Sequence, residues 1–310
     1  MGIPAVIEVE DFTKTFGRND EPAVKSISFE VQNGEILGLA GLNGAGKTTT
    51  IRAISGIILP STGTITVDGH NIVTDKIQAS RGIGWVPEFP NFEPNARAIP
   101  LLKYYAGFYG IKGQEAEKLA RELLRQVDLE PAVRKKLRSY SQGMKKRFAL
   151  ASAMISSPQN FLFDETLNGL DPEGINYLRK LIVKFKEEGK AIFLSSHILN
   201  ELENLADRTI IIHRGEIIET LSRDRMRNLG KPVLKVRLNK VDSQAIKLLE
   251  EYGTVSVEGD TLTVINLKSG PGSADDVNAE LIKAGYKVSM FNVQGASLEE
   301  YFFQLVGEKK

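Results

Sequence analysis

The most informative segment of the chain is Gly41-Leu42-Asn43-Gly44-Ala45-Gly46-Lys47-Thr48. It matches the phosphate-binding loop pattern, which is a glycine, four residues of any type and then Gly-Lys-Ser/Thr. The apolar run Ile36–Ala40 precedes it as a strand, and a helical pattern follows it to about Ser55. Glycines let the backbone curl so that its N–H groups point at phosphate oxygens, and the helix N-terminus adds partial positive charge. The sequence therefore predicts a nucleotide-binding α/β domain.

Individual residues of this segment have expected roles in binding and catalysis. Lys47 would bridge the β- and γ-phosphates, and the Thr48 hydroxyl would ligate Mg²⁺. An ordinary glycine turn before a helix is the structural alternative, and the strand and helix on either side argue against it. The residues that we expect to bind ATP here are Gly41, Asn43, Gly44, Ala45, Gly46, Lys47, Thr48 and Thr49.

Two adjacent carboxylates end the apolar run Phe161–Phe163. Ligands of α/β sheets bind at the carboxyl ends of the strands. Neighbouring side chains of a strand point to opposite faces, so the two carboxylates can have different roles. We expect Asp164 to hold Mg²⁺ through water and Glu165 to orient and polarise the attacking water. A solvated strand end is the structural alternative.

The composition predicts a globular protein of more than one domain. The chain has 310 residues, of which 42% are hydrophobic and 25% are charged. Its net charge of +1 makes nucleic acid an unlikely partner by global attraction. The absence of cysteine excludes disulfides, thiolate metal sites and a cysteine nucleophile. No apolar run approaches the roughly 20 residues that cross a bilayer.

Short apolar runs alternate with helical patterns up to about residue 220, which predicts a largely parallel α/β sheet. Its expected strands are Ile36–Ala40, Ile83–Val86, Phe161–Phe163, Ala191–Leu194 and Thr209–Ile212. Three further runs alternate between apolar and polar residues and predict an antiparallel flank. These runs are Val6–Val9, Ser26–Val31 and Gly63–Val67.

Two regions interrupt or follow this pattern. Prolines and then helical patterns at Leu101–Phe108, Gln114–Val127 and Gln142–Ser156 predict a helical subdomain over about residues 89–159. After the break at Gly230-Lys231-Pro232, the order βαββαβ predicts a small α+β, ferredoxin-like domain. Its last helix would begin with a capping box of Ser297 and Glu300. We therefore expect an ATPase domain at 1–228 and an accessory domain at 229–310.

Three further motifs complete an ordered set. Tyr140-Ser141-Gln142-Gly143-Met144 precedes Asp164, Leu167-Asn168-Gly169-Leu170-Asp171 follows it, and Ser195-Ser196-His197 follows a further strand. The order resembles the P-loop ATPase subunits of ATP-binding cassette (ABC) transporters over about residues 5–225. The motif sequences most resemble those of drug- and sodium-efflux ATPases. Their C-terminal appendages often end like the stretch at 295–302.

The resemblance implies a head-to-tail pair of ATPase domains that binds two ATP molecules at its interface. Ser141, Gln142 and Gly143 of one subunit would close over the γ-phosphate that is bound by the loop of the other. His197 resembles the residue that contacts the γ-phosphate, and Asp171 would bridge the subunits. Phe16 resembles the aromatic residue that stacks on adenine, with ordinary core packing as its alternative.

Three positions depart from the family pattern. Glu88 stands where glutamine is usual, so it either ligates the metal or has a raised pKa. Gln142 stands where many members have glycine, and Thr166 stands where proline is commonest. We regard the last change as minor because Glu165 is kept.

Two surface features leave their interpretation open. Seven basic residues lie in the fourteen positions from Arg134 to Arg147, and a solvated surface competes there with phosphate or ribosome contact. The apolar stretch from Leu101 to Tyr109 is either subdomain core or the surface that receives a membrane partner.

The sequence and the resemblance together predict an ATP-hydrolysing subunit of an ABC transporter of the exporter type, with ATP and Mg²⁺ as its cofactors. A homodimer would drive a separate transmembrane permease, and the chain would be cytoplasmic, peripheral on the inner face of the membrane. The alternatives are an ABC-type ATPase that acts on ribosomes or nucleic acid, and a non-hydrolytic nucleotide sensor.

Overall fold

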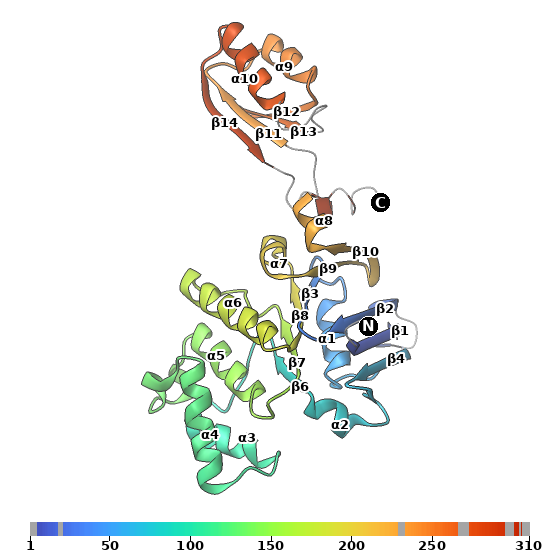
Figure 1. Ribbon diagram of the computed structural model, residues 1–310, viewed down its shortest axis with the longest axis vertical. Helices are drawn as coiled ribbons and strands as arrows, with labels where there is room; N and C mark the ends of the chain where they lie inside the picture. The colour runs from blue at the N-terminus through green and yellow to red at the C-terminus, as the bar shows by residue number, and fades with distance from the viewer. Residues whose placement is uncertain are drawn as a thin grey trace. The chain divides into compact units, whose positions relative to one another are not determined.

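The computed structural model describes residues 5–17, 21–228, 233–265, 273–294, 301–303 and 305. The chain divides into two compact units, Met1–Ser222 and Arg223–Lys310, which are described separately (Figure 1). In the part of the chain that the structure describes, no helix is long and apolar enough to span a bilayer.

A six-stranded sheet forms the centre of the first unit. Its strand order is β10-β9-β3-β8-β7-β6, with every neighbouring pair parallel except β10 and β9. The strands are β3 (Ile36–Ala40), β6 (Ile83–Val86), β7 (Asn160–Asp164), β8 (Ala191–Ser196), β9 (Arg208–His213) and β10 (Glu216–Ser222). All residues of β3, β7 and β8 are buried, as expected for parallel strands covered on both faces. The predicted parallel sheet is confirmed.

An antiparallel sheet of order β2-β1-β4-β5 covers one face of the central sheet. Its strands are β1 (Ala5–Lys14), β2 (Val24–Gln32), β4 (Thr62–Val67) and β5 (His70–Asn71). Helix α1 (Lys47–Ile54) contacts β4 of this sheet and β7 and β8 of the other, and Ile51 and Ile54 join the core that both sheets share. The predicted antiparallel flank is confirmed.

Helices α6 (Pro172–Glu187) and α7 (Leu199–Leu205) pack on the opposite face of the central sheet, against β8 and β3 (Figure 1). Short α2 (Lys76–Arg81) precedes β6 and was not expected from the sequence. The first helical turns after β3 and β7 therefore begin at the carboxyl edge of the sheet, where α/β proteins bind their ligands.

The predicted helical insertion lies between β6 and β7. It contains α3 (Ala98–Gly107), α4 (Gly113–Gln126) and α5 (Gln142–Ala153), with 3₁₀ turns at Glu130–Ala132 and Leu137–Ser139. Helix α3 begins three residues before the predicted start at Leu101, because Pro100 is tolerated in a first turn, where its missing N–H has no intrahelical acceptor.

The second unit begins with α8 (Arg223–Asn228) and continues in the order β11-α9-β12-β13-α10-β14. The bounds are β11 (Val233–Leu238), α9 (Ser243–Glu250), β12 (Thr254–Glu258), β13 (Thr261–Ile265), α10 (Ser273–Lys283) and β14 (Val288–Gln294). The sheet order is β12-β13-β11-β14, and every neighbouring pair is antiparallel. This element order is the βαββαβ order that the sequence predicted. The expected capping box at Ser297 and Glu300 lies outside the described residues.

Candidate active site

The phosphate-binding loop connects β3 to α1 and lines a cavity of about 470 Å³. Gly44 and Gly46 have φ values of 80° and 110°, a region that side-chain-bearing residues rarely adopt. A Cβ atom on Gly46 would lie 2.8 Å from the Ala23 carbonyl oxygen, so this position has room only for glycine. The loop therefore directs the N-terminus of α1 at the cavity, as phosphate binding requires.

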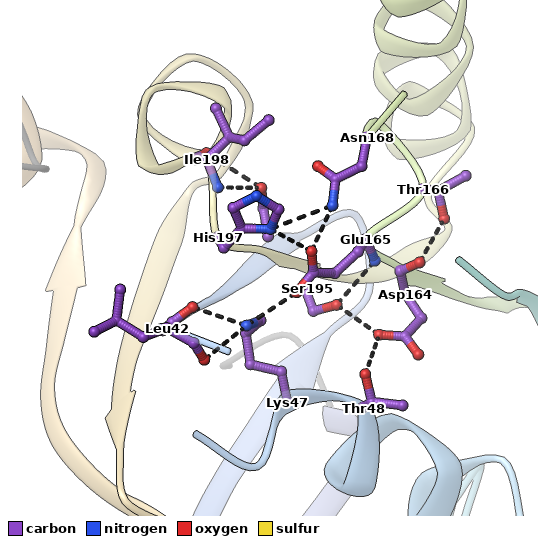
Figure 2. A network of polar contacts seen from close by, with 12 residues as sticks. Leu42, Lys47, Thr48, Asp164, Glu165, Thr166, Asn168, Ser195, His197 and Ile198 are labelled. Carbon is purple, nitrogen blue, oxygen red and sulfur yellow. Dashed lines mark hydrogen bonds and ion pairs between the residues drawn. The ribbon is translucent and has the colours of Figure 1, made fainter. Parts of the chain in front are cut away.

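Lys47 is buried at the floor of this cavity, with 4% of its side chain exposed. Its ammonium donates hydrogen bonds to the carbonyl oxygens of Gly41 (2.8 Å) and Leu42 (3.1 Å) and forms an ion pair with Glu165 Oε1 at 2.9 Å (Figure 2). An ammonium has three N–H donors, so these partners use all of them. A phosphate oxygen can bind Lys47 only by replacing one of these contacts.

Asp164 ends β7 beside Thr48 and Ser195 (Figure 2). Its Oδ1 accepts hydrogen bonds from Thr48 Oγ1 at 3.1 Å and from Ser195 Oγ at 3.0 Å. Burial raises the pKa of Asp164, and the two hydrogen bonds partly oppose that rise. Mg²⁺ prefers hard oxygen ligands such as hydroxyls and carboxylates. The neighbouring oxygens of Thr48 and Asp164 thus fit the metal ion that accompanies ATP.

Glu165 has an unusual backbone for a glutamate, with a φ of 45°. Such a conformation costs on the order of 1–3 kcal/mol and persists where the surroundings enforce it, often at functional sites. Here its N–H donates to both the carbonyl oxygen (3.2 Å) and the Oγ (3.0 Å) of Ser195. This anchor turns the Glu165 carboxylate toward Lys47 and His197 (Figure 2).

The electrostatics of the cavity keep Glu165 ionised. Burial raises its pKa, but the hydrogen bonds and charges of Lys47 and His197 outweigh burial, so the pKa is lowered overall. His197 Nδ1 and Asn168 Nδ2 both contact Glu165 Oε2, and these two nitrogens are 3.3 Å apart. A carboxylate held in its charged form can orient water and accept a proton.

Glu88 follows β6 and lines the same cavity. Burial raises its pKa, and the neighbouring charges of Glu165 and Asp164 raise it further. A raised pKa is one of the two consequences expected when glutamate replaces the usual glutamine, and Glu88 has it. Metal ligation by Glu88 stays a prediction.

Most of the predicted nucleotide-binding residues lie together. The residues of the prediction that line the cavity are Asn43, Gly44, Gly46, Lys47, Thr48, Thr49, Glu88, Glu165 and His197. Gly41 and Ala45 belong to the same loop, and a Cβ on Gly41 would meet the Ile212 carbonyl oxygen at 2.5 Å.

The other predicted residues do not line this cavity. Phe16 is 64% exposed, which excludes its core alternative, and the Lys14 ammonium lies over its ring at 5.3 Å from the centroid. Ser141 caps α5 by accepting from Met144 N–H at 3.2 Å, and Asp171 caps α6 by accepting from Gly174 N–H at 3.0 Å. Ser141, Gln142 and Asp171 are exposed. Their expected roles on the nucleotide of a second subunit stay predictions.

Two residues that contact the carboxylates were not assigned from the sequence. Ser195 holds Asp164 and the Glu165 backbone, and Asn168 holds the Glu165 side chain. Both residues belong to motifs named above. Their contacts with Asp164 and Glu165, however, depend on strand pairing between β7 and β8 and on a turn. The Asn168 N–H closes that turn on the Glu165 carbonyl oxygen at 3.2 Å.

The basic run from Arg134 to Arg147 is not one surface. Lys146 is 3% exposed, and Arg147 pairs with Asp128 at 3.0 Å while it stacks over the Tyr177 ring. Arg134, Lys135, Lys136 and Arg138 are exposed. The exposure of these four residues fits a solvated surface and a contact surface equally, whereas the burial of Lys146 rules out a solvated position for that residue.

Comparison with known proteins identifies the family. A family model described as "ABC transporter" matches residues 24–168. The chain is 34% identical to the bacitracin transport ATP-binding protein BcrA of Bacillus licheniformis, over 97% of each chain. It is 30% identical to the linearmycin resistance ATP-binding protein LnrL of Bacillus subtilis (strain 168), over 97% of this chain and 98% of that protein.

A solved structure of an ATP-binding subunit of an ABC transporter matches with a TM-score of 0.65 and 31% identity, covering 72% of this chain and 92% of that one. The resemblance inferred from the ordered motifs is thus confirmed in both sequence and fold. The chain belongs to the ABC transporter family as an ATP-binding subunit, an ATPase that works with ATP and Mg²⁺.

Proposed function

We propose that this subunit powers export through a separate membrane permease, and that Glu165 is the group that activates water for ATP hydrolysis. The observation that carries the proposal is the contact of the buried Lys47 and Glu165 with each other and with the more exposed His197, in the cavity of the phosphate-binding loop. Its charges, hydrogen bonds and strained backbone are those of a catalytic site rather than of a packing core.

The contacts of Lys47 suggest how binding and catalysis are linked. When ATP binds, a γ-phosphate oxygen competes with Glu165 for the Lys47 ammonium, because the other two donors are held by backbone carbonyls. Release from Lys47 leaves the Glu165 carboxylate free to orient water, and its φ of 45° keeps it aimed into the cavity. His197 and Asn168 remain beside it to fix its second oxygen.

Magnesium has a natural place in this arrangement. Thr48 and Asp164 would hold the ion, with Glu88 as a further ligand. When bound, Mg²⁺ neutralises charge on the β- and γ-phosphates. Ser195 keeps Asp164 in place through its 3.0 Å hydrogen bond.

A homodimer would complete the site. Ser141 and Gly143 at the start of α5 lie outside the cavity of their own chain, yet Ser141 presents a hydroxyl at a helix N-terminus, which suits an anionic target. We propose that they bind the γ-phosphate in the second subunit, with Asp171 across the interface and Phe16 on adenine.

An exposed aromatic cluster on α3 and just after it supports a permease partner. Tyr104 is 64%, Phe108 is 70% and Tyr109 is 43% exposed, and the Tyr104 and Phe108 rings pack edge to face at 5.2 Å. Large exposed aromatic groups mark interaction surfaces. Relatives named for bacitracin transport and linearmycin resistance favour export, and the permease would hold this chain at the inner face of the membrane.

The proposed division of labour follows the predicted domains. Residues 1–228 would form the ATPase domain, with its helical subdomain at about 89–159, and residues 229–310 would form an accessory domain.

The experiment is capture of partners on tagged protein from detergent-solubilised membranes of the source organism in Mg-ATP. Tagged Glu165→Gln should retain a protein with several membrane spans. Tagged Lys47→Ala should retain less of that membrane protein, because the part of the capture that depends on bound ATP is lost. Ribosomal proteins or nucleic acid in place of a membrane protein would overturn the transporter proposal.

A further inference from the structure

One buried charged side chain has no role in the site described so far. Lys146 lies on α5 with 3% of its surface exposed, and no carboxylate lies within ion-pair distance of its ammonium among the described residues. Burial lowers the pKa of Lys146, and the more distant charges of Glu88 and Glu165 oppose that fall only in part. A buried charge without a close counter-ion is expensive, so packing alone does not explain a lysine here.

The ammonium instead holds a loop of the active site. Lys146 Nζ donates a hydrogen bond to the carbonyl oxygen of Thr166 at 2.9 Å and another to the carbonyl oxygen of Asn168. Both carbonyls belong to the turn Glu165–Asn168, as its second and fourth residues. The Asn168 amide on that turn donates to Glu165 Oε2 (Figure 2).

The loop is fixed from two other sides. The Thr166 hydroxyl donates to the Val86 carbonyl oxygen at 3.2 Å, which joins the loop to the end of β6. Leu170, two residues after the turn, lies near the start of α5, since a Cβ added to Gly143 would be 3.5 Å from its side chain. Lys146 is therefore the charged contact between the loop and the helix that carries Ser141 at its start.

We propose that Lys146 is a positioning residue that holds the Glu165–Asn168 turn against α5, so that the Asn168 amide stays on the catalytic carboxylate. Rotation of α5 would move Lys146 and with it the carbonyls of the turn. Binding of Ser141 to a partner's nucleotide would thereby change how the turn positions Glu165 in the same subunit. The inference rests on the proposed role of Glu165.

The test is a double-mutant cycle on the full chain, using Lys146→Met, Asn168→Ala and the two combined. Methionine keeps the length and helix propensity of lysine but has no donor. Lys145→Met is the matched control, because Lys145 is the neighbouring, more exposed residue of α5. ATPase rates are divided by the number of ATP-binding sites measured by calorimetry, which removes any unfolded fraction.

Lys146→Met should lower kcat about tenfold with KM within about twofold of wild type, because Lys146 does not line the cavity. Asn168→Ala should lose a similar factor. If Lys146 acts through Asn168, the double variant should be no more than about twofold slower than the slower single variant. Lys145→Met should match wild type.

A merely structural lysine would give losses that multiply in the double variant, and that result overturns the proposal. So does a Lys146→Met enzyme with wild-type kcat per site. A wild-type chain that hydrolyses no ATP, or a Glu165→Gln variant at full rate, would instead overturn the proposed function on which this inference rests.

Discussion

The two units of the molecule differ in whether they bury charged side chains. At the edge of the central sheet, the side chains of Lys47, Lys146, Asp164 and Glu165 are all buried. The described residues of the second unit contain no buried Asp, Glu, Lys or Arg, and their core consists of residues such as Leu234, Val236, Leu262 and Tyr286.

In the second unit, a polar cluster forms around Asp242 at the surface. Asp242 caps α9 and accepts hydrogen bonds from Tyr286 and the Ala245 N–H. The Tyr286 hydroxyl, followed by that N–H and by Lys240, holds the pKa of Asp242 well below its usual range. The first unit also buries Glu35 and Glu201, each in an ion pair with an arginine, so the feature that marks its site is a buried lysine next to buried carboxylates. The described charged residues of the second unit stay at least partly exposed, and Asp242 among them caps a helix.

The largest expected effect is the loss of Lys47. Lys47→Ala removes the ammonium that a phosphate would bind, and we expect ATP affinity to fall by about 100-fold or more. The matched change in the second unit, Lys240→Ala, removes a lysine that is 3.0 Å from Asp242 and should leave ATP affinity unchanged. Titration calorimetry measures both. Equal affinities for Lys47→Ala and wild type would refute the phosphate-loop assignment.

An intermediate effect is expected from single hydroxyls. Ser195→Ala removes the hydrogen bonds to Asp164 Oδ1 and from the Glu165 N–H, so it should lower stability by about 1–2 kcal/mol and kcat by about tenfold. Tyr286→Phe removes the hydroxyl that contacts Asp242 and should lower only the unfolding temperature. A Tyr286→Phe enzyme with reduced kcat per ATP site would break the contrast between the units.

The smallest effect concerns Glu88 and depends on pH. Burial and the charges of Glu165 and Asp164 raise the pKa of Glu88, so its ionisation disfavours the folded state. The penalty is absent below the ordinary glutamate pKa of about 4.3 and grows as pH rises through the raised pKa. In EDTA, Glu88→Gln should therefore unfold about 2 °C higher than wild type at pH 7.5, with a smaller gain at pH 5.

Thermal scans at the two pH values, repeated with Mg-ATP, measure this difference. If Glu88 ligates the metal, Mg-ATP should stabilise wild type more than Glu88→Gln and narrow the gap. A Glu88→Gln protein that unfolds below wild type at pH 7.5 in EDTA would contradict the electrostatic account.

Local sequence patterns predicted most of the first unit. Parallel strands such as β3 and β6 matched to the residue because buried strands are continuous apolar runs. Strand β10 was not predicted, since six of its seven residues are at least partly exposed and carry no strong apolar signal. Helix α2 is short and buries Ala79 alone, so its pattern was equally weak.

Site residues were likewise predictable where their role depends on local sequence, and not where it depends on tertiary contacts. Glycine, lysine and threonine at fixed spacing placed the phosphate loop, because its chemistry is local. Ser195 and Lys146 could not be assigned, since they act on residues about 20 to 31 positions away through strand pairing and helix packing. The burial of Lys146 was hidden within a basic run that is typical of a solvated surface.

Glu165 carries the central claim, and its amide variant tests it most directly. Glu165→Gln should bind Mg-ATP, lose about 100-fold or more of its turnover, and elute as a dimer in size-exclusion chromatography with ATP but as a monomer without it. Wild type should dimerise only transiently if, as proposed, hydrolysis separates the subunits. A Glu165→Gln protein that hydrolyses ATP at the wild-type rate would contradict the account.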